Sequence, residues 1–335
     1  MHEAMFYDRE EDNRVRCRLC RHHCLIGDGG YGICRVRRNL GGVLQSLCYG
    51  QLVAANADPV EKKPLFHYRP GTFTFSIATP GCNFRCRHCQ NYSIAQVEPA
   101  DLPTGPERSP AEVVAAARRQ RCDSLSYTYA EPTIFYEFAM ATARLAKEAG
   151  LGNIFVTNGY IEDEPLAAIA PYLDAANIDL KGFTEKHYRE VCGATLAGVL
   201  ATIRSYRRHG IWLEITTLVI PGLNDSDEEL ARIAGFIRDE TGAETPWHVS
   251  RFYPTYRLTD RPATPAATVE RAREIGLAAG LKHVYTGNLP AGGGEDTACL
   301  GCGATVVARS GYTVRSNRLQ DGRCPDCGGA VAGCW

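Results

Sequence analysis

Three cysteines in one short loop, Cys82, Cys86 and Cys89, constrain this chain more than any other feature. Their C-x3-C-x2-C spacing can bring three thiolates to one face of an iron–sulfur cube, whereas a [4Fe–4S] cluster usually has four cysteine ligands. Three ligands leave one iron open, as a catalytic metal site keeps a position free for substrate. The β-rich run 72–79 ends at a Pro-Gly pair, so we expect the loop to follow the carboxyl end of a strand. On spacing alone, a zinc site or a partial cluster loop stays open as an alternative.

The 15 cysteines of the 335-residue chain are clustered, and this pattern bears on where the protein works. The chain opens on charged residues without an apolar signal-peptide core, and it has no run of about 18 apolar residues that would span a membrane. We therefore expect reduced, metal-binding cysteines in a cytoplasmic protein, not a disulfide framework. The net charge of −1 does not favour nucleic acid as a partner.

Between about residues 73 and 290, apolar β-type runs alternate with amphipathic stretches. Strands are expected at 73–79, 124–129, 153–157, 175–180, 211–219, 246–252 and 282–286. Helices are expected at 111–121, 134–150, 164–172, 185–209, 226–241 and 265–280. This alternation predicts a parallel sheet in an α/β fold, and about six units predict an open, partial (β/α)6-type barrel over residues 72–291. In such barrels the chemistry lies at the carboxyl ends of the strands.

Residues 1–71 form a cysteine-rich leader, whose last part, 49–71, reads as an extended connector. The leader cysteines follow C-x2-C-x3-C-x9-C and are Cys17, Cys20, Cys24 and Cys34. Four thiolates suit a closed zinc site or a complete [4Fe–4S] cluster, and we expect an auxiliary site that is structural or relays electrons. Seven arginines between residues 14 and 38 could form a basic surface for an acidic partner or nucleic acid, but charge balance beside four thiolates is the preferred interpretation. In the connector, Glu61, Lys62, Lys63 and His67 are candidate substrate contacts, unless the segment is a solvated linker.

Residues 292–335 form a separate tail. Two C-x2-C pairs, Cys299 with Cys302 and Cys324 with Cys327, are separated by 21 residues. This pattern predicts a zinc-ribbon-like module. Zinc is the favoured metal, and a further iron–sulfur cluster stays open because thiolates bind both.

Polar residues follow several predicted strands where a (β/α) barrel would place its active site. Glu131 follows the second strand, Asn158 the third, and Asp179 and Lys181 the fourth. Asp179 and Lys181 are two positions apart, so they can share one face and act together. A single polar residue at a strand end often caps the next helix instead. Each residue alone is therefore weak evidence for an active site, and the assignment depends on their joint order after the cysteine motif.

The C-x3-C-x2-C motif, followed by these strand ends, resembles the radical S-adenosylmethionine (SAM) enzymes. The resemblance implies that the amino and carboxylate groups of SAM chelate the open iron, and that an electron from the cluster splits SAM into methionine and a 5′-deoxyadenosyl radical. It implies SAM contacts for Glu131, Asn158, Asp179 and Lys181, with Lys181 pairing the carboxylate, and an external flavodoxin- or ferredoxin-like electron donor. Tyr129-Ala130 replaces the two glycines of the family's GGE region, and His88 is expected to pack near the cofactor.

The segment 58–65, the leader cysteines and the segment 251–254 together resemble the radical SAM enzymes of the AmmeMemoRadiSam system, relatives of the pyruvate formate-lyase activating enzyme. The activating enzymes often have Cys-His-Asn after the last ligand, whereas this chain has Cys89-Gln90-Asn91. The resemblance implies a radical SAM oxidoreductase that abstracts hydrogen from a substrate carbon. Its target would be a glycine on a partner protein, or a small molecule or peptide handled with neighbouring system proteins. An electron-transfer or metal-scaffold protein and an RNA-modifying radical SAM enzyme are the alternatives.

Overall fold

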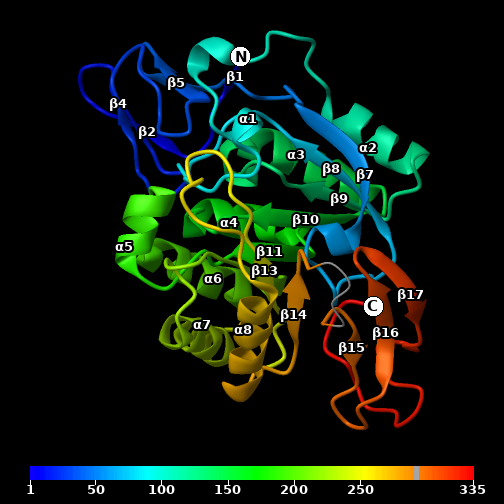
Figure 1. Ribbon diagram of the computed structural model, residues 1–335. Coiled ribbons are helices and arrows are strands. Elements are labelled where there is room, and N and C mark those ends of the chain that lie inside the picture. The colour runs from blue at the N-terminus through cyan, green and yellow to red at the C-terminus, as the bar shows by residue number, and fades with distance from the viewer. Residues whose placement is uncertain (290–293) are drawn as a thin grey trace.

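The computed structural model describes residues 1–289 and 294–335, and an eight-stranded sheet lies at its centre (Figure 1). The strand order is β14-β13-β12-β11-β10-β9-β8-β7. Strands β8 to β14 are parallel to their neighbours, and β7 runs antiparallel at one edge. The strands are β7 (Ala54–Pro59), β8 (Phe73–Ala78), β9 (Ser124–Tyr127), β10 (Gly152–Thr157), β11 (Ala175–Asp179), β12 (Trp212–Val219), β13 (Trp247–Arg251) and β14 (Val284–Gly287). The predicted α/β fold with a parallel, partial open sheet is confirmed.

Helices connect the parallel strands and lie around the outside of the sheet (Figure 1). They are α2 (Pro110–Arg119), α3 (Tyr136–Glu148), α4 (Asp163–Ile169), α6 (Leu196–Arg208), α7 (Asp227–Glu240) and α8 (Ala266–Ala278). Local sequence fixes several of their starts: Ser109 and Glu112 form a capping box before α2, and Ser226 caps α7. Shorter helical pieces are η1 (Val60–Lys62), α1 (Tyr92–Ala95), η2 (Pro99–Asp101), η3 (Pro132–Phe135) and η4 (Ala170–Tyr172). Among the described residues, no helix combines the length and apolarity needed to cross a membrane.

The helix expected over 185–209 is wrong as a single element. It is divided into α5 (Glu185–His187), a π-helical turn η5 (Tyr188–Cys192) and α6, with Gly193 in the left-handed region at φ 74°. The break frees two carbonyl groups, which accept hydrogen bonds from the cysteine loop (residues 80–91): Arg85 N donates to Cys192 O at 2.8 Å, and Arg87 N to Val191 O at 2.9 Å. The interruption therefore anchors the loop that carries the three-cysteine motif.

The leader adds two small sheets on the blue side of Figure 1. One sheet holds β1 (His2–Glu3), β6 (Val43–Ser46) and β5 (Arg37–Leu40), and the other holds β2 (Tyr7–Arg9), β3 (Val15–Cys17) and β4 (Leu25–Ile26). A buried ion pair ties the leader to α3, because Arg37 Nη2 lies 2.7 Å from Glu137 Oε2 with both side chains 2% exposed. Losing one partner of such a pair is costly, so this contact fixes the leader on the sheet.

The tail forms a third small sheet of β15 (Thr297–Ala298), β16 (Thr305–Ser310) and β17 (Thr313–Asn317), coloured orange to red in Figure 1. Arg309 of β16 donates to Phe66 O of the connector at 2.6 Å, and Cys334 N donates to His67 O at 2.7 Å. The connector therefore lies between the sheet and the tail. The predicted boundary at 291/292 lies outside the described residues.

Candidate functional site

A cavity of about 400 Å³ opens where the parallel strands end. Its walls include Thr128 after β9, Asn158 after β10, and Ser250 near the end of β13. Every residue predicted for the catalytic cluster and SAM lines this cavity: Cys82, Cys86, Cys89, Glu131, Asn158, Asp179 and Lys181. The structure thus brings together residues that come from four separate parts of the chain.

The three loop cysteines are not as compact as the ligands of a single metal ion. Within residues 1–289 and 294–335, only the four tail cysteines have all their ligand atoms within 4.8 Å of one another. A single ion needs such close ligands, whereas a cubane takes each thiolate at a different iron. Burial raises the pKa of Cys82 well above its ordinary value, so its thiolate needs a compensating positive charge such as bound iron. The loop therefore fits a [4Fe–4S] cluster better than one zinc ion.

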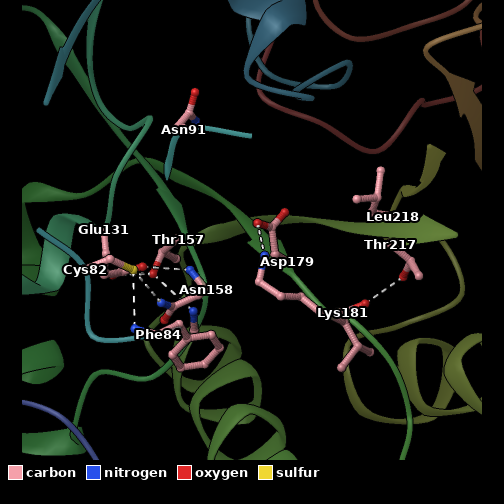
Figure 2. A network of polar contacts seen from close by, with 12 residues as sticks. Cys82, Phe84, Asn91, Glu131, Thr157, Asn158, Asp179, Lys181, Thr217 and Leu218 are labelled. Carbon is pink, nitrogen blue, oxygen red and sulfur yellow. Dashed lines mark hydrogen bonds and ion pairs between the residues drawn. The ribbon is translucent and has the colours of Figure 1, made fainter. Parts of the chain in front are cut away.

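Glu131 holds the end of β10 against the cysteine loop (Figure 2). Its carboxylate accepts hydrogen bonds from Thr133 N, Thr133 Oγ1 and Thr157 Oγ1 at 3.0, 2.6 and 2.8 Å, and from Asn158 N at 2.8 Å. Asn158 Nδ2 in turn donates to Asn83 Oδ1 at 2.7 Å and lies 3.8 Å from Cys82 Sγ. Because four donors occupy the Glu131 oxygens, this geometry favours a positioning role for Glu131.

Asp179 and Lys181 form an ion pair on the cavity wall, as their shared strand face predicts (Figure 2). Lys181 Nζ lies 2.7 Å from Asp179 Oδ2, and its backbone N donates to Tyr188 Oη at 3.0 Å. Burial alone would lower the pKa of Lys181, but Asp179 and the neighbouring Cys86 raise it well above its ordinary value. Lys181 is therefore a permanent cation in the cavity.

Two lysines of the connector, Lys62 and Lys63, also line this cavity. Lys62 Nζ and Lys63 Nζ each lie 2.8 Å from an oxygen of Asp58, and the hydroxyl of Tyr129 donates to the same carboxylate. Lys63 is only 1% exposed, and burial lowers its pKa to about 8 although Asp58 opposes this shift. Two lysines against one carboxylate give this wall, which we call the basic wall (Asp58, Lys62, Lys63 and Tyr129), a surplus of positive charge.

The other two connector residues proposed as substrate contacts do not line the cavity. Glu61 is buried with its Oε1 3.7 Å from Arg309 Nε, and His67 lies 2.6 Å from both Tyr285 Oη and Ala332 O. Both residues face the tail, so they attach the tail to the sheet. The structure assigns Lys62 and Lys63, but not Glu61 and His67, to the cavity.

Tyr129 keeps the backbone shape that a glycine would favour. Its φ is 62°, in the left-handed region, and its carbonyl accepts a hydrogen bond from Asn91 Nδ2 at 2.7 Å. Such a conformation costs a non-glycine residue about 1–3 kcal/mol and is often found at functional sites. Tyr129 therefore adopts a left-handed conformation despite its side chain and adds a phenol to the cavity wall.

Sequence reasoning missed several residues of the cavity, among them Asn288 and Tyr312, and gave His88 a different role. Asn288 and Tyr312 line it from loops, and Tyr312 comes from the hairpin between β16 and β17 of the tail. No local pattern could connect these positions to the cysteine loop. His88 was expected to pack, and it is 4% exposed, but it also lines the cavity and its Nδ1 has no partner among the described residues.

The leader cysteines line a second, smaller cavity. Cys17, Cys20, Cys24 and Cys34 surround it together with Arg37 and with Asn83 of the cysteine loop. The nearby arginines do not form a free basic surface, because six of the seven lie within 4.0 Å of a carboxylate. These arginines therefore pair with carboxylates, and of the seven only Arg37 lines the cavity beside the four thiols.

The four tail cysteines form a compact site. Cys299 Sγ lies 3.5 Å from Cys327 Sγ, and Cys302 Sγ lies 3.7 Å from Cys324 Sγ. Sulfurs bound to one tetrahedral zinc at about 2.3 Å lie about 3.8 Å apart. Backbone N–H groups of Cys302 and Gly301 lower the pKa of Cys299 to about 7, which favours its thiolate. The tail therefore has the geometry of a single metal site.

Comparison with known proteins relates both the fold and the site to a known superfamily. A model of the radical SAM superfamily matches residues 76–234. An uncharacterized protein of Methanocaldococcus jannaschii is 47% identical over 98% of both chains. A crystal structure of a radical SAM methyltransferase from Sphaerobacter thermophilus has a TM-score of 0.51 at 18% identity, covering 68% of this chain and 71% of that one. That likeness concerns the fold.

Two curated activating enzymes are similar to part of the chain. The isethionate sulfite-lyase activating enzyme of Nitratidesulfovibrio vulgaris is 27% identical over 46% of this chain and 53% of its own length. The pyruvate formate-lyase-activating enzyme of Streptococcus mutans is 26% identical over 49% of this chain and 65% of its own length. The chain thus spans about half to two thirds of these enzymes.

Proposed function

Because a model of the radical SAM superfamily matches residues 76–234, we propose that the chain is a radical SAM oxidoreductase that cleaves SAM reductively and abstracts hydrogen from a substrate carbon. The observation that carries this proposal is one cavity lined by the three thiols of Cys82, Cys86 and Cys89, the cation of Lys181 and the buried amide of Asn158. Cys82, Cys86 and Cys89 would hold a [4Fe–4S] cluster, which would supply the one-electron reduction that cleavage of SAM requires.

The residues around the cluster loop fit the polar groups of SAM. Asn158 Oδ1 is buried without a partner among the described residues, so it can accept a hydrogen bond from the amino group. Lys181 supplies the positive charge for the carboxylate, and Asp179 orients its ammonium. Glu131 acts on SAM through Asn158, whose backbone it holds. Together these residues orient the cofactor and keep water out, which is the protein's contribution to radical chemistry.

The substrate, we infer, carries an anionic group such as a carboxylate or phosphate. The basic wall has a surplus cation and lies in the same cavity as the cysteine loop. Tyr312 of the tail closes this side and can donate a hydrogen bond to the same group. A small molecule or peptide suits this enclosed wall, and the departure Cys89-Gln90-Asn91 also favours an AmmeMemoRadiSam-type enzyme over a glycyl-radical activase. A cytoplasmic ferredoxin- or flavodoxin-like protein would supply the electron.

The test is formation of 5′-deoxyadenosine by anaerobically reconstituted, reduced protein after addition of SAM. We expect product from the wild type and only background from Cys82→Ala. Cys122→Ala is the matched control, because Cys122 is also buried but lies outside the cavity. An absence of product from the wild type, or equal amounts from Cys82→Ala, would refute the enzyme proposal and favour a metal-scaffold or electron-transfer role. A persistent protein radical on a partner would favour glycyl-radical activation instead.

A further inference from the structure

We propose that Cys17, Cys20, Cys24 and Cys34 ligate a second [4Fe–4S] cluster that lies directly against the loop of the first. All four thiols are free, and all four line one cavity. Cys17 ends β3, and its backbone N donates to Cys24 O at 2.9 Å, which brings the first and third cysteines together. Four thiols around one cavity match the complete ligand set of a cubane.

The leader sulfurs are less compact than those of the single-ion site in the tail. The four tail cysteines show how compact a single-ion site is in this chain, because all their sulfurs lie within 4.8 Å of one another. No other set of three or more such ligands among the described residues is that compact, and this includes the leader cysteines. At least one pair of leader sulfurs is therefore more than 4.8 Å apart, which a cubane accommodates because it binds each thiolate at a different corner.

Arg37 supplies hydrogen-bond donors for the occupant of this cavity. Its Nη2 is held by Glu137, but its Nε and Nη1 are buried without partners among the described residues. Arg37 is 2% exposed and is part of the cavity wall. Buried N–H groups need acceptors, and the sulfurs of an iron–sulfur cluster accept such hydrogen bonds.

The leader cavity and the cysteine loop are in direct contact. Asn83, the residue after Cys82, lines the leader cavity, and His22 Nε2 lies 2.8 Å from Asn83 O. A Cβ on Gly81 would lie 3.0 Å from Cys34 O and 2.7 Å from Val36 Cγ1, so the two segments pack without spare room. The two clusters would therefore be separated by little more than one residue of backbone. This proximity rests on the proposed function, whereas the ligand assignment does not.

Iron and sulfide analysis tests the ligand assignment. Two clusters predict about eight irons per reconstituted chain, and Cys20→Ala/Cys34→Ala is expected to lose about four irons and four sulfides. Its zinc content should stay that of the wild type. Cys48→Ala/Cys122→Ala, two buried cysteines outside these sets, is the control and should lose nothing. Loss of zinc with no loss of iron would overturn the proposal.

A complementary variant covers the case in which the leader variant fails to fold. Cys82→Ala/Cys86→Ala/Cys89→Ala is expected to keep about four irons and an electron paramagnetic resonance signal that SAM does not change. In the reduced wild type, the neighbouring clusters should give a signal broadened by their magnetic interaction. A triple variant without iron–sulfur would refute the second site, and two non-interacting signals would refute the proximity. A wild type that holds both clusters but forms no 5′-deoxyadenosine would refute only the proposed function.

Discussion

Replacement of Arg309 by methionine should detach the tail from the sheet. The Arg309 and Glu61 side chains are both fully buried, with Arg309 Nε 3.7 Å from Glu61 Oε1. Arg309 also donates to Phe66 O and Thr297 Oγ1, and its guanidinium lies 4.3 Å from the Phe66 ring centroid. Removing one partner of a buried pair costs about 3–5 kcal/mol, because the other charge remains unpaired. We therefore expect a loss of that size in the free energy that holds the tail in place.

The loss should depend on pH through Glu61. Burial raises the pKa of Glu61, and Arg309 opposes that shift, so the variant should raise the pKa further. A carboxyl group whose pKa is raised by folding makes its full contribution to protein stability below the unfolded pKa of about 4.3. That contribution is lost as pH rises through the folded pKa. The defect of Arg309→Met should therefore grow from pH 4 toward neutrality. The double variant Glu61→Gln/Arg309→Met lacks the unpaired charge and should show a smaller, pH-independent loss.

Hydrogen exchange of the β16 and β17 amides measures this detachment directly, and urea unfolding gives the global free energy. The control is Arg318→Met in the same tail, because its partner Asp326 lies 2.6 Å away but both side chains are more than 40% exposed. Exposed pairs contribute about 0–1 kcal/mol. If the β16 amides are as well protected from exchange in Arg309→Met as in Arg318→Met, the reasoning on the buried pair is wrong.

Three further results are expected. Nuclear magnetic resonance of 13C-methylated lysines should show Lys63 losing its proton near pH 8, because burial lowers its pKa to about 8. Asp58→Asn should lower the pKa of Lys63 further, because Asp58 opposes the effect of burial. An ordinary lysine pKa for Lys63 would contradict the buried basic wall. Cys302→Ser should reduce the zinc content of the tail without changing iron, measured by elemental analysis, and unchanged zinc would contradict the single-ion site. Gly81→Ala should lower the free energy of unfolding by about 1–3 kcal/mol in thermal unfolding, because the new Cβ would meet Val36 and Cys34 at a φ of 98°. Gly105→Ala is the control, because a Cβ at Gly105 would have no atom within 4 Å. Equal stability of the two variants would refute the close packing.

The parallel sheet could be predicted from sequence because its signals are local. Buried strands read as apolar runs, and helix starts such as Ser109 carry caps within a few residues. Strand β7 was missed because Ala-Ala-Asn-Ala-Asp-Pro has no β-branched or aromatic residue to mark a strand, and the segment pairs antiparallel with β8. The break at Gly193 was missed because its reason lies in the distant cysteine loop, whose N–H groups it satisfies.

The site was predictable where residues share one strand or one loop. Asp179 and Lys181 were placed correctly on one face because alternate strand positions share a face. Tyr312 and Asn288 were not found, because only the tertiary arrangement of the tail and the last loop brings them to the cavity. The occupied oxygens of Glu131 likewise could not be foreseen, since their donors come from two different strand ends.

Mössbauer spectroscopy of 57Fe-reconstituted protein, with and without SAM, tests the central claim most directly. The measurement uses the Cys20→Ala/Cys34→Ala variant. This variant lacks two ligands of the proposed second cluster, so that only the iron at Cys82, Cys86 and Cys89 is observed. We expect SAM to change the spectrum of about one iron in four, because three cysteines leave one iron without a protein ligand. A spectrum that SAM leaves unchanged, or a loop that holds no iron at all, would contradict the account.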